Sequence, residues 1–127
     1  MFEISAKFSI SSAHYLRDYP GKCKNLHGHN WKVTVAVRGG QLAADGMLLD
    51  FGDLKKMMKT VENELDHKSL NDLGDFESQN PTAENIARHI FVKISGLLAS
   101  SGRSGLEVAR VSVFETENCE AVYYEKP

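Results

Sequence analysis

Apolar and polar residues alternate along the first ten positions of the chain, which is the pattern of a half-buried β-strand. The even positions from Phe2 to Ile10 are apolar, and the odd positions between them are polar. The same two-residue period returns in residues 29–39, HNWKVTVAVRG, and the glycines at 39 and 40 end it. These segments predict two strands, and their regular alternation favours an antiparallel sheet.

A helical spacing of apolar residues follows in two segments. Asp50 is a candidate N-cap for the first helix, whose apolar residues recur at helical spacing over residues 54–65. The second helix is expected to begin with Asn80 or Thr82 as its cap and with Pro81 in its first turn. Its inward face consists of regularly spaced apolar residues: Ile86, Ile90, Ile94 and Leu97.

Two more strands are predicted beyond the Ser/Gly-rich loop 100–105. Residues 106–116, LEVARVSVFET, place Val111, Val113 and Glu115 on one face, and residues 120–125 form the fourth strand. The order ββααββ predicts an α+β fold, because two amphipathic helices can cover one face of a four-stranded antiparallel sheet. The other face and both edges would remain exposed, so we expect an oligomer whose sheets join edge to edge.

The composition places the chain among ordinary globular proteins. Its 127 residues fit a single domain over 1–127, and 42% hydrophobic with 25% charged residues exclude disordered, collagen-like and coiled-coil proteins. A net charge of -2 provides no basic surplus for binding nucleic acid. There is no membrane-length apolar run and no signal-peptide pattern, so we expect a cytoplasmic protein without membrane contact. The two cysteines, Cys23 and Cys119, are expected to be free thiols.

The strongest candidate chemistry is a metal site built from histidines. Residues two apart on a strand point to the same side, so His27 and His29 can converge on one ion. His14 lies near the end of the first strand, and an antiparallel hairpin brings that end beside the start of the second. Three imidazoles would make a catalytic-type zinc site, which uses three protein ligands. The alternative is an incidental pair with His14 as a satisfied strand-end residue, and the position of His14 favours the metal site.

Cys23 immediately precedes the histidine pair. It is flanked by Lys22 and Lys24, and neighbouring lysines favour the thiolate form of a cysteine. The thiol could be a fourth metal ligand, a base or nucleophile, or inert. A fourth ligand would close the site and make it structural, whereas a free thiolate beside an open zinc site would indicate catalysis.

Three acidic or imidazole groups elsewhere have both a plain and a functional interpretation. Asp66 and His67 could be an ordinary helix end, where a histidine interacts favourably with the helix dipole, or a proton relay. Glu115 could be solvated at a strand end, or it could accept two N–H bonds from a guanidine-like ligand edge. His89 and Cys119 have no evident functional companions in the sequence, and no role is predicted for either of them.

The motifs run along nearly the whole chain in a fixed order: His14, Cys23, HGH at 27–29, LDHKSLND at 65–72, NPTAEN at 80–85 and FET at 114–116. This set resembles the 6-pyruvoyltetrahydropterin synthase family. The Cys-x-x-x-His-x-His spacing is most similar to its bacterial branch, the 6-carboxy-5,6,7,8-tetrahydropterin synthases.

The resemblance implies a tunnelling fold (T-fold), in which trimers close their sheets into barrels and two trimers stack into a hexamer with active sites between subunits. It also implies roles for individual residues. The zinc (Zn2+) ligands would be His14, His27 and His29, and Cys23 would be the general base. Asp66 and His67 would be relay partners, Glu115 would anchor the pterin ring, and Thr82 and Glu84 would lie near the pterin pocket.

The implied reaction converts a small-molecule pterin triphosphate, 7,8-dihydroneopterin triphosphate, to 6-carboxy-5,6,7,8-tetrahydropterin with release of acetaldehyde and triphosphate. The resemblance places this reaction in queuosine and 7-deazapurine biosynthesis. Arg17, Lys22 and Lys24 are candidates for triphosphate binding on charge alone. Three alternatives remain: the pyruvoyltetrahydropterin reaction, an aldolase-like cleavage of dihydroneopterin, and a non-catalytic zinc module closed by one cysteine and three histidines.

Overall fold

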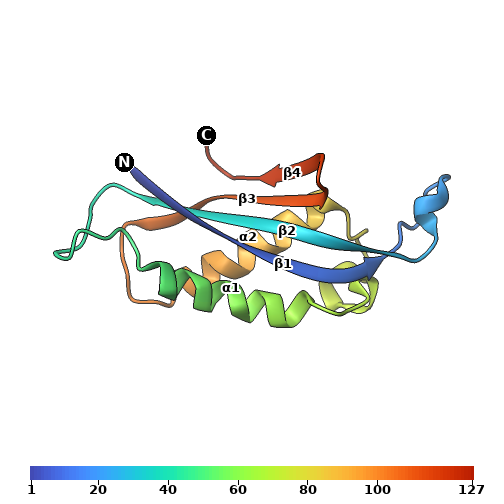
Figure 1. Ribbon diagram of the computed structural model, residues 1–127, viewed down its shortest axis with the longest axis horizontal. Helices are drawn as coiled ribbons and strands as arrows, with labels where there is room; N and C mark the ends of the chain where they lie inside the picture. The colour runs from blue at the N-terminus through green and yellow to red at the C-terminus, as the bar shows by residue number, and fades with distance from the viewer.

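Four antiparallel strands form one sheet in the order β1-β2-β3-β4, so each strand pairs with its neighbour in sequence. The computed structural model describes residues 1–127 and gives six main elements: β1 (Phe2–His14), β2 (His27–Gly39), α1 (Phe51–Leu65), α2 (Ala83–Ala99), β3 (Leu106–Thr116) and β4 (Cys119–Tyr123). Short 3-10 turns occupy the connections: η1 (Lys22–Lys24), η2 (Leu70–Asp72) and η3 (Gly74–Phe76). The predicted α+β class and the order ββααββ are confirmed (Figure 1).

Both helices pack on the same side of the sheet. α1 lies against β1, and α2 lies against β3 and β4 (Figure 1). The core between the sheet and the helices consists of side chains from alternate strand positions and from one face of each helix. It includes Ile10, Trp31, Val33, Val111, Leu54, Val61, Ile86 and Ile90. Positions of the opposite parity, such as Lys7 and Lys32, are exposed on the face that no helix covers. The apolar alternation in the sequence therefore determined which face is buried. No helix is both long enough and apolar enough to cross a membrane.

Each helix begins with a side-chain cap. The Asp50 carboxylate accepts a hydrogen bond from the Gly52 amide at 2.6 Å, as the sequence predicted for α1. Thr82 caps α2, because its hydroxyl accepts from the Asn85 amide at 3.1 Å. Pro81 therefore precedes the cap, and its predicted place in the first helical turn is wrong. The carbonyl of Pro81 lies outside the helix and can accept a bond from another part of the chain.

The β1–β2 hairpin is longer than the apolar alternation alone indicated. Pairing continues past Ile10 to His14, which lies opposite His27, and Ser12 lies opposite His29. The polar side chains at this end interrupt the apolar pattern without interrupting the backbone ladder, since the ladder needs only the amide and carbonyl groups. The extension places the end of β1 directly beside the start of β2, at the histidines.

The segment after α1 covers part of the outer edge of β1. The Ser11 amide donates to the Asp66 carboxylate at 2.7 Å, and the His67 amide donates to the Ser11 carbonyl at 2.7 Å. Two residues on, the Ala13 amide donates to the Lys68 carbonyl at 2.9 Å. Closer to the N-terminus, over residues 2–9, this edge carries no backbone bond. The edge is therefore protected at the histidine end and exposed at the other.

Candidate metal centre and active site

Three histidine rings meet where the β1–β2 hairpin closes. The ligand atoms of His14, His27 and His29 all lie within 4.8 Å of one another. His14 ends β1, His27 begins β2 directly opposite, and His29 is two residues farther along the same face. The closest pair is Nε2 of His14 and Nε2 of His27, which are 3.0 Å apart. The structure thus brings together the three residues that the sequence predicted as metal ligands.

The hydrogen bonds of two rings fix their tautomers. Nδ1 of His14 lies 2.7 Å from the Pro81 carbonyl, and Nδ1 of His27 lies 2.7 Å from the Asn25 carbonyl. A carbonyl oxygen only accepts, so each Nδ1 must carry a proton, and in the neutral ring each Nε2 then presents a lone pair. Two lone pairs facing each other at 3.0 Å repel, and a cation between them relieves that repulsion.

The third ring lacks any hydrogen-bond partner at the atom that faces the cluster. Nε2 of His29 is buried and makes no hydrogen bond, and the nearest carboxylate oxygen, on Glu115, is 3.7 Å away. Unpartnered buried polar atoms are rare in folded proteins. Two facing Nε2 atoms and a third ring with an unbonded nitrogen, all close together, fit a divalent metal with three imidazole ligands.

Burial favours the metal-binding form in two of these rings. Removal from water lowers the pKa of His14 below the ordinary histidine value, and the same effect lowers the pKa of His29. Neutral imidazole is the ligand form. Trp31 forms one wall of the cluster: it contacts His14 and His29 edge-to-face, and its indole N–H donates to the Ser12 carbonyl at 3.2 Å. The fully buried indole therefore restricts how the rings can turn.

Asp66 and His67 form a second, more exposed unit. Oδ2 of Asp66 accepts from Nδ1 of His67 at 2.8 Å, while its other oxygen accepts from the Ser11 amide. The Ser11 bond is the main cause, and the His67 bond the second, of a pKa of Asp66 below its ordinary value. With Nδ1 donating to the carboxylate, Nε2 of His67 is left free to accept a proton. The imidazole is 81% exposed, so this nitrogen is accessible.

The backbone at His67 has an uncommon conformation. Its φ angle is +56°, in the left-handed region that non-glycine residues seldom occupy. Asp66, by contrast, is extended, so the chain turns sharply at the end of α1 and runs along the edge of β1. The hydrogen bond from the His67 amide to the Ser11 carbonyl holds that turn in place. The pair is therefore held both by the edge of the sheet and by the end of α1, where the Asp66 amide donates to the Glu62 carbonyl at 2.8 Å.

An open groove of about 460 Å³ lies beside both units. It is lined by residues of β1, β2 and the segment after α1: Ser11, Ser12, Ala13, Gly28, His29, Asn30, His67, Lys68 and Ser69. His29 of the histidine cluster and His67 of the acid–imidazole pair thus border one surface depression. Gly28 has no side chain, so nothing projects into the groove from this position.

The other predicted residues are distributed around the cluster. Glu115 is near His29, but Cys23 is not among the mutually close ligand atoms. Cys23 lies in η1, on a loop that projects beyond the hairpin, where its carbonyl accepts from the Leu16 amide at 2.9 Å (Figure 1). Thr82 caps α2 next to Pro81, and Glu84 is exposed in the first helical turn. The cysteine is consequently near the cluster in sequence and separate from its ligand set.

His89, for which the sequence predicted no role, has two carboxylate partners that the sequence did not indicate. Nδ1 of His89 lies 2.8 Å from Asp75 Oδ2, and Nε2 lies 3.0 Å from Glu64 Oε1. The ring is buried and also contacts Phe76. Its partners are 14 and 25 residues away in sequence, and no local pattern connects them to it.

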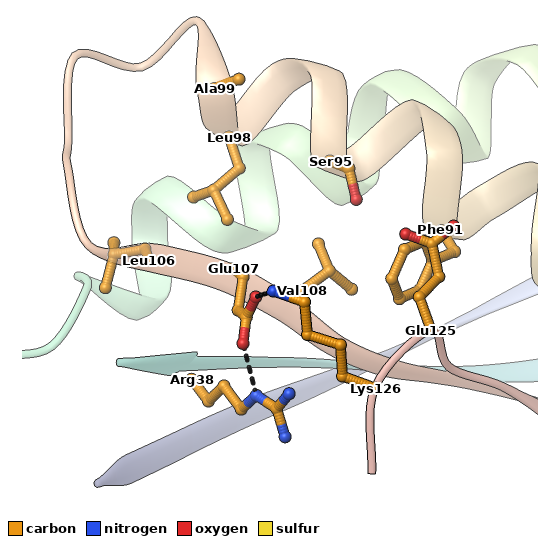
Figure 2. A pocket seen from close by; sticks show the side chains of 10 residues that line it. All are labelled: Arg38, Phe91, Ser95, Leu98, Ala99, Leu106, Glu107, Val108, Glu125 and Lys126. Atoms are coloured by element: carbon orange, nitrogen blue, oxygen red, sulfur yellow. Dashed lines mark hydrogen bonds and ion pairs between the residues drawn. The ribbon is translucent and has the colours of Figure 1, made fainter. Parts of the chain in front are cut away.

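A separate cavity of about 200 Å³ lies between α2, β3 and the C-terminal residues (Figure 2). Figure 2 shows Glu107 between Arg38 and Lys126, at 2.8 Å from Arg38 Nε and 3.1 Å from Lys126 Nζ. Hydrogen bonds from Arg38 first and Lys126 second hold the pKa of Glu107 below its ordinary value. Arg38 is eleven residues from His27 on β2, roughly 35 Å along the strand. This cavity contains none of the predicted site residues.

The chain is similar to named proteins over nearly its full length. A family model described as 6-pyruvoyl tetrahydropterin synthase matches residues 3–126. A 6-carboxy-5,6,7,8-tetrahydropterin synthase of Synechocystis is 40% identical over 98% of this chain and 94% of its own. The protein of the same name from Bacillus subtilis is 34% identical over 98% of this chain and 86% of its own.

Members with the pyruvoyl name are comparably similar. The human 6-pyruvoyl tetrahydrobiopterin synthase is 35% identical over 95% of this chain and 90% of its own. The solved structure of Caenorhabditis elegans 6-pyruvoyl tetrahydropterin synthase superposes with a TM-score of 0.86 at 29% identity, covering 98% of this chain and 96% of that chain. The fold is therefore the T-fold, and the chain belongs to the 6-pyruvoyl tetrahydropterin synthase family.

Proposed function

We propose that this protein is a zinc-dependent lyase that converts 7,8-dihydroneopterin triphosphate to 6-carboxy-5,6,7,8-tetrahydropterin, releasing acetaldehyde and triphosphate, as a step in 7-deazapurine biosynthesis. The observation that carries the proposal is the close approach of three imidazoles at the end of the β1–β2 hairpin, two of which are held at Nδ1 by a carbonyl while the third has a buried Nε2 without a hydrogen bond. Curated relatives with the carboxytetrahydropterin synthase name, at 34–40% identity, support the choice of reaction.

His14, His27 and His29 would hold the zinc ion. When bound there, zinc supplies Lewis-acid polarisation to oxygen atoms of the substrate side chain. The protein's contribution is to present three neutral imidazoles in fixed orientations. The carbonyls of Pro81 and Asn25 provide this orientation for two of the rings by holding a proton on Nδ1.

Proton transfer is assigned to Cys23 and to the Asp66–His67 pair. The Cys23 thiolate would remove a carbon-bound proton from the substrate side chain, and His67 would return or relay protons through Nε2. Asp66 holds the His67 ring through the 2.8 Å contact at Nδ1, so one tautomer is presented to the groove. Because η1 projects away from the hairpin, Cys23 would act either after the loop closes or in a neighbouring subunit (Figure 1).

Recognition of the pterin ring is assigned to Glu115, with Thr82 and Glu84 near the ring. A carboxylate can accept two N–H bonds from the guanidine-like edge of a pterin, which is a strong and directional contact. Glu115 is half-buried beside His29, so a ring held there would have its side chain close to the metal ligands.

The protein is proposed to act as a hexamer made of two trimers. The exposed backbone edge of β1 over residues 2–9 and the outer edge of β4 support this assembly, because unpaired edges favour strand addition. The face of the sheet without helices would then line the inside of the ring. Residues assigned to one active site could come from two subunits.

The pyruvoyl reaction is the second candidate, favoured by the 35% identity to the human enzyme of that name. Incubation of the zinc-loaded protein with dihydroneopterin triphosphate, followed by mass analysis, distinguishes the two. We expect 6-carboxytetrahydropterin together with acetaldehyde. A pyruvoyl product would assign the protein to the other reaction, and absence of turnover by metal-loaded protein would contradict both.

A further inference from the structure

Residues 15–17 follow the end of β1 and keep backbone hydrogen bonds on both sides of the chain. Past the pair His14–His27, the Leu16 amide still donates to the Cys23 carbonyl on one side. On the opposite side, the backbone groups of Tyr15 and Arg17 point away from β2 and need other partners. Two asparagine side chains from the segment between the helices provide them.

Each asparagine bonds both backbone groups of one residue. The Tyr15 amide donates to Asn71 Oδ1 at 2.9 Å, and Asn71 Nδ2 donates back to the Tyr15 carbonyl at 3.0 Å. The Arg17 amide donates to Asn80 Oδ1 at 2.8 Å, and Asn80 Nδ2 donates to the Arg17 carbonyl at 3.1 Å. Paired N–H and C=O bonds to one residue are the pattern that an antiparallel partner strand makes. The two primary amides therefore replace a strand.

These bonds continue the edge contacts that begin earlier on β1. The segment 66–80 bonds the backbone of every second residue from 11 to 17. Asp66 and His67 bond residue 11, and Lys68 bonds residue 13. Asn71 bonds residue 15, and Asn80 bonds residue 17. His14 lies between two bonded positions, so its backbone is held on both sides. Its ring is held by the same segment, because Pro81, which accepts from Nδ1 of His14, directly follows Asn80.

The two asparagines are themselves firmly placed. Asn71 is only 3% exposed, and the Arg17 guanidinium reaches its carbonyl at 3.4 Å. Another guanidinium nitrogen of Arg17 donates to the Gln79 carbonyl at 3.2 Å, and the Asn80 carbonyl accepts from Asn85 Nδ2 at 2.8 Å. The segment carrying Asn80 and Pro81 is thus tied both to Arg17 and to the first turn of α2. A displacement of Asn80 would move the carbonyl that orients His14.

We infer that Asn71 and Asn80 are positioning residues for the metal ligand His14: by replacing a missing strand, they set the place and orientation of its ring. The inference rests on the metal site of the proposed function and is independent of the substrate. The asparagines touch neither the metal ligand atoms nor the reacting groups, so they act through His14 and through Pro81.

The test compares metal affinity in Asn80→Ala, Asn80→Asp and the wild-type protein by competition with a zinc chelator. Loss of a group that orients a metal ligand lowers affinity about 10–100-fold, and we expect Asn80→Ala to fall in that range. Asn80→Asp keeps the oxygen that accepts from the Arg17 amide, so its affinity should be intermediate. The control is Asn63→Ala, an exposed residue of α1, which should bind zinc like the wild type.

Two further measurements separate positioning from general stability. The absorption spectrum of bound Co2+ reports ligand geometry and should change in Asn80→Ala. Thermal unfolding of the metal-free variants shows whether each folds at the temperature of the binding assay, and Asn80, which is less buried than Asn71, is therefore the principal variant. A folded Asn80→Ala with wild-type zinc affinity and an unchanged Co2+ spectrum would overturn the inference. Failure of the wild-type protein to bind zinc would instead overturn the proposed metal site on which the inference depends.

Discussion

Two buried histidine environments in this protein differ in what surrounds the ring nitrogens. At the end of the hairpin, His14 and His27 each donate from Nδ1 to a backbone carbonyl and direct an unprotonated Nε2 toward the other ring. On α2, His89 lies between two carboxylates, Asp75 and Glu64, with a contact at each nitrogen. Both groups are packed into the protein, yet only the first leaves lone pairs unused.

The difference follows from the chemistry of the partners. A carbonyl holds one proton on the ring and leaves the second nitrogen as a base or a ligand. At His89 each ring nitrogen already contacts a carboxylate oxygen, so neither nitrogen is left without a partner to bind a metal. A metal-binding histidine is therefore distinguished from a structural one by whether its second ring nitrogen has a hydrogen-bond partner, and not by how deeply the ring is buried.

The largest predicted effect is on metal content. His27→Ala removes one of the three converging ligand atoms, so we expect purified protein to retain no stoichiometric metal, as measured by elemental analysis. His89→Ala is the matched control and should keep the wild-type amount. Full metal occupancy in folded His27→Ala would exclude this residue as a ligand and remove the contrast between the two environments.

The next effect separates the ligand set from its catalytic neighbour. Cys23→Ala should retain metal and lose turnover by about 10²–10⁴-fold, the usual contribution of a positioned acid or base. Metal content and product formation, measured on the same preparation, test the two parts of this prediction. Turnover near the wild-type rate would show that Cys23 is not the base, while loss of metal would place the thiol in the ligand set.

A smaller effect on stability is expected at the other environment. His89→Ala leaves Glu64 and Asp75 without their shared donor and removes a ring that packs on Phe76. We expect the free energy of unfolding of metal-free protein to fall by about 1–3 kcal/mol in urea denaturation. Asp75→Asn should cost less, since the Asp75 side chain is 68% exposed. A His89→Ala protein as stable as the wild type would mean that the two contacts contribute no net stability.

The smallest effect is a dependence of stability on pH in metal-free protein. Burial lowers the pKa of His14 and His29, so below the ordinary value of 6.5 the unfolded chain binds protons that the folded chain resists. Stability should therefore fall as the pH drops from above 6.5 toward the lowered pKa values. Denaturation midpoints at several pH values measure this trend, and His29→Gln should weaken it. A midpoint that rises on acidification through this range would contradict the assigned direction.

Much of the fold could be predicted because strand alternation and helical spacing are local. The register that places His14 beside His27 followed from antiparallel pairing of two alternating segments that are neighbours in sequence. The sequence could not indicate which carbonyls hold the rings, because Pro81 reaches His14 across 67 residues. For the same reason the carboxylates around His89 were missed. Long-range partners depend on how the layers pack, which no periodicity in the chain encodes.

The edge contacts of β1 also bear on how the protein folds. The bonds from residues 11, 15 and 17 to the segment between the helices join positions 55 to 63 residues apart in sequence. Contacts of this kind form late, because the intervening chain must close a long loop first. The local hairpin can bring the three histidines together early, whereas the ring of His14 is oriented only once both helices are in place. High-affinity metal uptake should accordingly coincide with the last step of folding, so a newly made chain would acquire its ion at completion rather than use it as a nucleus.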